Sequence, residues 1–350
     1  MSGRPNGLGR RRKRPPVESV ADVAQRLAVL LAAGVPPGAA WQFLTEATVL
    51  EATASEGTAT RRDHGRTVRT GDVATTGEII AEAAVTASRG GDVARSIASS
   101  AGLPARAARS RPDESAVRSA WCGLAAALRV ATESGTPMAE ALRVLAGALR
   151  DVGQTQRDRA VALAGPKATA RTVIALPAVG LLFGAGLGFD TLHILFATAA
   201  GIGCLIVGIV LMLLAHLWNR ALVRRATPRE TMPGLALELV AMAMSGGGSV
   251  PAALTRATGA CVDFGLDPPS DDAVRPVLTL AERAGVGAVE LLRAEAEQLR
   301  RDARGSAQEA SAALAVRLMA PLAVCVLPAF MLLSVAPLVM SILSSTLGGL

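Results

Sequence analysis

Apolar residues follow two patterns along this chain. Through most of the sequence they recur at helical spacing, as in residues 20–31, where one face is apolar and the opposite face carries charge. In residues 172–219 and 318–350 they run on almost without interruption: these stretches contain no Lys or Arg, and Asp190 is their only acidic residue. No segment shows the alternation typical of strands. The pattern predicts an all-α protein built from amphipathic helices and long apolar segments.

The apolar segments are long enough for three transmembrane helices. A helix needs about 20 mainly apolar residues to cross a hydrocarbon core of roughly 30 Å. We expect the first helix over residues 172–189 and the second over 192–218, separated by a short turn at Asp190. The third is expected over 318–343. The chain is therefore predicted to be an integral membrane protein.

Charge next to these segments predicts their orientation. Four basic residues lie in 157–171, before the first segment, and four lie in 220–229, after the second, whereas the connection between them carries Asp190 alone. Basic flanks favour the cytoplasmic side. We therefore expect a multi-pass protein of the cytoplasmic membrane with a cytoplasmic N-terminus and an external tail at 344–350.

Small residues and prolines within these segments indicate helix packing. Gly180, Gly184 and Gly188 repeat every four residues, a pattern that lets helix backbones approach closely. Pro177 and Pro328 should kink the helices or mark their ends. No Lys, Arg, Asp or Glu lies in the middle of a segment, where one would indicate a transport pathway.

The remaining sequence predicts two cytoplasmic helical bundles, because amphipathic helices joined by tight turns pack in this way. The first covers residues 20–171 and includes a polar loop at 51–73, and the second covers 219–317. Residues 1–19 form a basic tail that we expect to be disordered. Its RRKR cluster fits either contact with anionic lipid or a solvated cytoplasmic tail.

Turn residues separate the helices of each bundle, and the two bundles resemble one another. LAAGVPPGAA matches MSGGGSVPAAL, with Val35 against Val250, and residues 133–151 match 281–302 at an offset of 150. IALPAVGLL in the first apolar segment matches CVLPAFMLL in the third. The chain thus contains an internal repeat, a bundle followed by an apolar segment, with turns expected at Gly34, Pro36, Gly135, Pro137, Pro251 and Gly285.

Composition adds little recognisable chemistry. The net charge is +7, but Tyr is absent and aromatic residues make up 3% of the chain, which disfavours nucleic-acid binding. The SGGGS stretch lacks the Gly-Lys-Ser/Thr ending of a phosphate loop. Neither the three His nor the four Cys residues form a metal-ligand pattern. We therefore predict no catalytic residue, no metal and no cofactor.

The turns and the C-terminal segment resemble a known family. AGVPPGAA, SGTPMAEALRVLA and above all LMAPLAVCVLPAFMLLSVAPLVMSIL are similar to sequences of type II secretion system F proteins, the platform proteins in the inner membrane of type II secretion and type IV pilus machines. The ending is most similar to the Tad/Flp pilus branch. The resemblance covers residues 20–50, 77–190 and 234–343.

This resemblance implies a scaffold without enzymatic activity. Its bundles would dock a cytoplasmic ATPase and couple it to the assembly of pilin-like subunits, and its partners would include a second platform protein or another copy of itself. Two Arg-Asp pairs at equivalent helix ends are candidates for the ATPase contact, although solvated ion pairs explain them as well: Arg150-Asp151 and Arg301-Asp302. The alternative functions are a transporter or permease subunit and a membrane-anchored enzyme.

Overall fold

The fold is known from a computed structural model that describes residues 16–56, 76–102, 112–162, 198–225 and 232–337, with isolated positions at 164–165, 179 and 339–340. Within these residues the secondary structure is helical and contains no strand. Two compact units are present. Unit 1 comprises residues 1–156 and 230–304, and unit 2 comprises residues 157–229 and 305–350.

Six helices of unit 1 come from the first half of the chain. Gly34, Gly90, Gly102 and Gly135, which follow four of these helices, have positive φ, a backbone conformation that other residues rarely adopt. The sixth helix passes from unit 1 into unit 2 at its C-terminal end. The six helices are α1 (Pro16–Ala32), α2 (Pro37–Glu56), α3 (Thr76–Ser88), α4 (Val93–Ser100), α5 (Pro112–Ser134) and α6 (Met138–Ala162).

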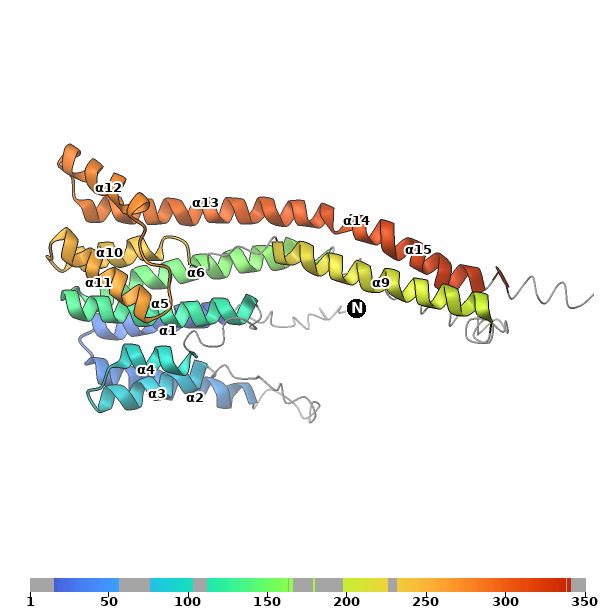
Figure 1. Cartoon of the computed structure of the whole chain (residues 1–350). Helices are drawn as coiled ribbons and strands as arrows, with labels where there is room; N and C mark the ends of the chain where they lie inside the picture. The colour runs from blue at the N-terminus through green and yellow to red at the C-terminus, as the bar shows by residue number, and fades with distance from the viewer. Residues whose placement is uncertain are drawn as a thin grey trace, which may run out of the picture. The chain divides into compact units, whose positions relative to one another are not determined.

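Four further helices of unit 1 come from the second half of the chain. The last of them also continues into unit 2. In Figure 1 the turns after α1, α5, α10 and α12 lie at the same end of unit 1. The four helices are α10 (Leu235–Ser245), α11 (Val250–Asp263), α12 (Asp271–Ala284) and α13 (Ala288–Arg317).

Helix α5 lies at the centre of unit 1 and packs against α1, α4, α10 and α11. Its middle section, residues 120–128, is buried throughout and includes Trp121 and four alanines. Alanine brings neighbouring helix axes close together, and for this reason one helix accommodates four partners. A single hydrophobic core thus contains residues of both halves of the chain. The expected two bundles are therefore corrected to one unit with one core.

Unit 2 contains α9 (Ala199–Arg225), the C-terminal part of α13 and a helical segment after it. This segment alternates between α- and π-helix. Each π turn occupies the residues two to six positions before a proline, Pro328 for the first and Pro337 for the second. Proline donates no hydrogen bond and its ring crowds the preceding turn, so a widened turn relieves the crowding without ending the helix. The segment comprises α14 (Met319–Pro321), η2 (Leu322–Val326), α15 (Leu327–Phe330) and η3 (Met331–Val335).

Two helices among the described residues are long and apolar enough to cross a membrane, judged by length and composition. They are Gly201–Val223 within α9 and the continuous helix Ala288–Leu333, whose second part is apolar. They overlap the second and third expected transmembrane helices. The first expected transmembrane helix, at 172–189, lies outside the described residues apart from position 179, and the tail at 344–350 lies outside them entirely.

Two boundaries differ from the expected ones. Helix α2 extends to Glu56, so residues 51–56 of the expected polar loop are helical, and the rest of that loop lies outside the described residues. Helix α1 begins at Pro16, so the last four residues of the expected disordered tail are helical. Proline is favoured in the first turn of a helix, where its missing N–H has no intrahelical partner, and Pro16 and Pro37 both begin helices. Helices α3 and α4, with a turn at Gly90, occupy the region between the expected loop and α5.

Candidate functional site: the junction between repeated helix pairs

The predicted turn residues lie at the ends of helices in unit 1. Gly34, Gly135 and Gly285 have positive φ values of 85°, 72° and 65°, as a glycine that ends a helix commonly does. Pro251 lies in the first turn of α11. The other two predicted residues, Pro36 and Pro137, immediately precede α2 and α6.

The pairs α5–α6 and α12–α13 match residue for residue around their turns. The ends of α5 and α12, the turn glycines and the starts of α6 and α13 are each 150 residues apart. The pairs α1–α2 and α10–α11 match in the same way at an offset of 213, with Gly34 equivalent to Gly247. This offset differs by two residues from the sequence match of Val35 with Val250, because the structure aligns the turns by their glycine conformation.

The α5–α6 turn packs directly against the α10–α11 turn. The hydroxyl group of Thr136 donates a hydrogen bond of 2.6 Å to the carbonyl oxygen of Met242. A Cβ atom at Gly246 would overlap the carbonyl oxygen of Ser134, so only glycine permits this approach. We call this contact the internal junction, because it joins the two halves of the repeat.

An arginine extends the internal junction along α5. Arg129 pairs with Glu133 on its own helix and with Asp263 at the end of α11, and its guanidinium group lies 5.9 Å from the centre of the Phe264 ring. The hydrogen bonds that Arg129 donates to these two carboxylates, first of all to Glu133, raise its pKa. The contact therefore combines ion pairing with a cation–π interaction.

A ladder of ion pairs joins α6 to α13. Arg293 Nη2 donates to Glu140 Oε1 at 3.0 Å, and Arg304 pairs with Asp151. Glu140 and Asp151 are 11 residues apart on α6, and so are the two arginines on α13. Because 11 residues make about three helical turns, the equivalent helices α6 and α13 run parallel and in register.

Glu238 of α10 lies in the middle of this ladder. It is 1% exposed, and its Oε2 accepts a hydrogen bond of 3.3 Å from Arg300 Nη1. Arg293 Nε lies 3.9 Å from the other carboxylate oxygen. Burial raises the pKa of the Glu238 carboxyl, against the lowering effects of Arg300 and Arg293. A buried carboxylate between two guanidinium groups is costly to leave unpaired, so this arrangement defines the position of α13.

The residues proposed for the ATPase contact have different surroundings. Asp151 is committed to Arg304 in the ladder. Arg301 is exposed and lies 3.5 Å from Glu297 within α13, and Asp302 accepts a hydrogen bond from Gln298. Arg150 is also exposed. Three of the four side chains therefore lie on the surface of unit 1, and the fourth has a structural role.

Helix packing in unit 2 uses small residues that the sequence analysis did not single out. Gly201, Gly208 and Ala215 are buried at intervals of seven residues on α9. A Cβ atom at Gly208 would crowd the side chain of Leu333, so the two helices meet closely at this position. Pro328 lies in the first turn of α15. The predicted packing residues Pro177, Gly180, Gly184 and Gly188 lie outside the described residues.

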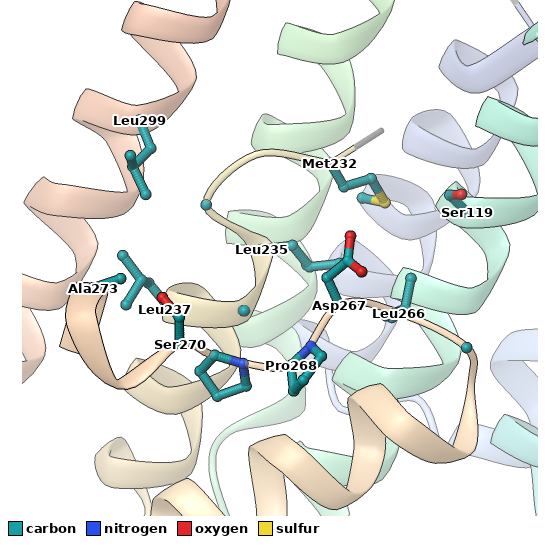
Figure 2. Close-up of a pocket in the computed structure, with 14 residues that line it drawn as sticks. Ser119, Met232, Leu235, Leu237, Leu266, Asp267, Pro268, Ser270, Ala273 and Leu299 are labelled. Carbon is teal, nitrogen blue, oxygen red and sulfur yellow. The ribbon is translucent and has the colours of Figure 1, made fainter. Parts of the chain in front are cut away.

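A small hollow of about 130 Å³ lies where the α11–α12 loop crosses α10. Figure 2 shows Met232, Leu235 and Leu266 around it, with Asp267 and Pro268 on the loop. Asp267 is exposed, and the remaining lining side chains are apolar or hydroxyl groups. This lining provides no pair of groups for acid–base or nucleophilic chemistry.

Sequence reasoning missed the charge ladder, although two signals point to it. Glu238 is the only charged residue in the apolar stretch 234–245, and a single carboxylate in such a stretch favours a buried partner. Arg293, Arg300 and Arg304 are spaced seven and four residues apart, on one face of a helix. Neither signal identifies which residue pairs with which.

Comparison with known proteins found no relative of this chain. No family model, no curated protein and no solved structure matches the chain.

Proposed function

We propose that the chain is a platform protein of the cytoplasmic membrane in a type II secretion or Tad/Flp pilus machine. In this role it couples a cytoplasmic ATPase to the assembly of pilin-like subunits. Unit 1 is the cytoplasmic docking body, and the apolar helices anchor it in the bilayer.

The observation that carries the membrane part of the proposal is the exposure of α9. In its most apolar 18-residue window only 17% of the residues are buried, and Ile206, Val210 and Leu213 are among the exposed side chains. Contact with water costs about 25 cal/mol for each Å² of such surface, whereas lipid accepts it. Trp218 and the arginines that follow it suit a helix end at the cytoplasmic interface.

The platform part rests on the repeated helix pairs and on the family resemblance. Each half of the chain ends in a long helix, α6 or α13, that leads toward an apolar segment. The ion-pair ladder holds these helices in register. A body of this kind suits the transmission of movement between a motor and the membrane better than chemistry on a small molecule.

Reporter fusions test the membrane topology. A periplasmic reporter, alkaline phosphatase, fused after Leu350 should be active, and the same enzyme fused after Arg225 should be inactive. The opposite result at either position would overturn the proposed orientation. Recovery of the untagged chain in the soluble fraction without detergent would overturn its membrane location.

Crosslinking in native membranes tests the role as a platform. A photo-crosslinking residue at Arg150 or Arg301, both exposed on unit 1, should capture a P-loop ATPase, whereas the same residue at Val210 of α9 should not. Deletion of the gene should abolish surface filaments or secretion while the ATPase remains folded. Normal filaments and normal secretion in the deletion strain would refute the proposal.

A further inference from the structure

A larger hollow, of about 440 Å³, lies in unit 2. The described residues that line it are Leu222 of α9 and one face of α13, which runs at helical spacing from Ser306 to Arg317. The middle of this face carries two alanines and a leucine, whereas both of its ends carry polar groups. The hollow is therefore apolar in its middle and polar at two opposite ends.

The sequence around the hollow places it at the edge of the apolar helices. Arg317 is the last charged residue before the apolar segment 318–343, and Leu222 lies four residues after Trp218, beyond the uncharged part of α9. Tryptophan is enriched at the level of lipid headgroups, and basic residues flank apolar helices on the cytoplasmic side. The hollow therefore lies at the depth of the cytoplasmic headgroups. This step rests on the membrane location in the proposed function and not on the role as a platform.

Two opposite charges line the hollow at different depths. Arg317 lies next to the apolar segment, and Glu309 lies eight residues earlier on α13, about 12 Å farther from that segment. Both side chains are exposed, and among the described residues neither forms an ion pair or a side-chain hydrogen bond. A ligand with an anionic group near the hydrocarbon and a cationic group farther out would complement this order of charges.

We propose that the hollow binds the headgroup of phosphatidylethanolamine from the cytoplasmic leaflet. Arg317 donates hydrogen bonds to the phosphate group, and Glu309 accepts one from the ammonium group. The apolar middle of the α13 face contacts the carbon atoms between the two charges. A choline headgroup carries the same charges but has no N–H to donate to Glu309, and a glycerol headgroup lacks the cation.

Fluorescence of Trp218 tests this site in the full chain. Trp218 lies one turn before Leu222 on the same face of α9 and is 41% exposed, whereas Trp41 and Trp121 are buried in the core of unit 1. The chain in detergent is titrated with phospholipids whose acyl chains carry bromine, which quenches tryptophan fluorescence on contact. Three headgroups are compared: ethanolamine, choline and glycerol.

Phosphatidylethanolamine should reach half-maximal quenching at a mole fraction about fivefold lower than either other lipid, as expected for an exposed charge pair. Equal mole fractions for the three lipids would refute the site but leave the membrane location of α9 in place. The absence of quenching by every lipid would refute the site and the membrane location together. A preference for the glycerol headgroup would show that basic residues attract anionic lipid without Glu309, and displacement by free phosphoethanolamine would identify a site for a soluble ligand. Either result would overturn the proposal.

Substitution of the carboxylate tests its part in the site. Glu309→Gln should abolish the preference for ethanolamine over choline, because the ammonium group loses its charged partner. Glu290→Gln is the matched control, at an exposed carboxylate of α13 within unit 1, and it should leave the preference unchanged. Retention of the full preference by Glu309→Gln would contradict the assigned role.

Substitution of the arginine separates the site from general attraction to basic helix ends. Arg317→Ala should raise the half-maximal mole fraction of phosphatidylethanolamine about fivefold. Arg220→Ala should change it less than about twofold, because Arg220 lies two residues from Leu222 and so on a different face of α9. Equal effects of the two substitutions would count against the hollow as the binding site. Circular dichroism of each variant verifies that the helices are retained.

Discussion

Helices α9 and α10 are both apolar on almost every face, yet their surroundings differ. In α10, eight of eleven residues are buried within unit 1, and one of them, Glu238, is the carboxyl partner of two arginines. In α9, side chains such as Ile206 and Val210 remain exposed around most of the helix, and a seam of small residues meets the segment 319–335. Length separates the two helices: 11 residues extend about 16 Å, too short for a bilayer, whereas 27 residues extend about 40 Å.

Apolar composition alone therefore does not show whether a helix is surrounded by protein or by lipid. Helix α10 is apolar because protein surrounds it, and it therefore includes a carboxylate that other side chains neutralise. Helix α9 carries no charged residue between Gly201 and Trp218, as expected of a helix in lipid, where no partner is at hand. The same type of substitution should therefore have different effects in α9 and in α10.

Removal of the buried charge in α10 should have the largest effect. Glu238→Ala leaves Arg293 and Arg300 without their buried partner and should lower the free energy of unfolding by about 3–5 kcal/mol. Chemical denaturation of the full chain in detergent, followed by circular dichroism, measures the loss. Glu290→Ala is the matched control, because Glu290 is an exposed carboxylate on α13. Equal losses in the two variants would show that the ladder contributes nothing specific.

A charge introduced into α9 should have the next largest effect. Val210→Arg should cost about 2.5–3.5 kcal/mol if the helix lies in lipid, but only about 0.5 kcal/mol or less if it lies in water. The measured quantity is the fraction of the chain that stays in membranes after alkaline extraction. Val85→Arg on α3 serves as the control for the expression of a variant with an added surface charge. Full retention of Val210→Arg in the membrane fraction would contradict a lipid-facing α9.

A methyl group at the internal junction should have a smaller effect. Gly246→Ala places a Cβ atom against the carbonyl oxygen of Ser134 and should destabilise unit 1 by about 1–3 kcal/mol. Gly259→Ala, in open space within α11, should instead stabilise the helix by about 0.5–1 kcal/mol. Thermal unfolding midpoints of the two variants should therefore shift in opposite directions, and a shift in the same direction would argue against the close approach of the two turns.

The smallest effect concerns pH. The pKa of Glu238 is raised in the folded state, so the folded chain binds a proton more readily than the unfolded chain does. The stability that this carboxyl contributes is then fully present below its unfolded pKa and is lost as the pH rises through the folded pKa. Glu238→Gln removes this dependence. The difference in unfolding midpoint between wild type and Glu238→Gln should fall as the pH rises from about 4.3, the unfolded pKa of Glu, and a difference that grows with pH would contradict the raised pKa.

The helices and their turns could be predicted from sequence because their signals are local. Apolar spacing located α1, α5 and α6, and Gly34, Gly135 and Gly285 have the backbone conformation that ends a helix. The contacts of the candidate site could not be predicted in the same way. Ser134 and Gly246 are 112 residues apart, and Arg304 is 153 residues from Asp151. No local pattern records such pairings, since many other carboxylates lie at similar positions on helix surfaces.

The sequence by itself determined that this chain is helical, where most of its turns lie, and that its two halves share a plan, because each of these depends on residues within a few positions of one another. The tertiary structure decided that the two halves share one core around α5 and that α13 is aligned with α6 by ion pairs. Those outcomes depend on which side chains fit together over long sequence separations. Packing and charge pairing in the folded chain determine which of these distant side chains come into contact.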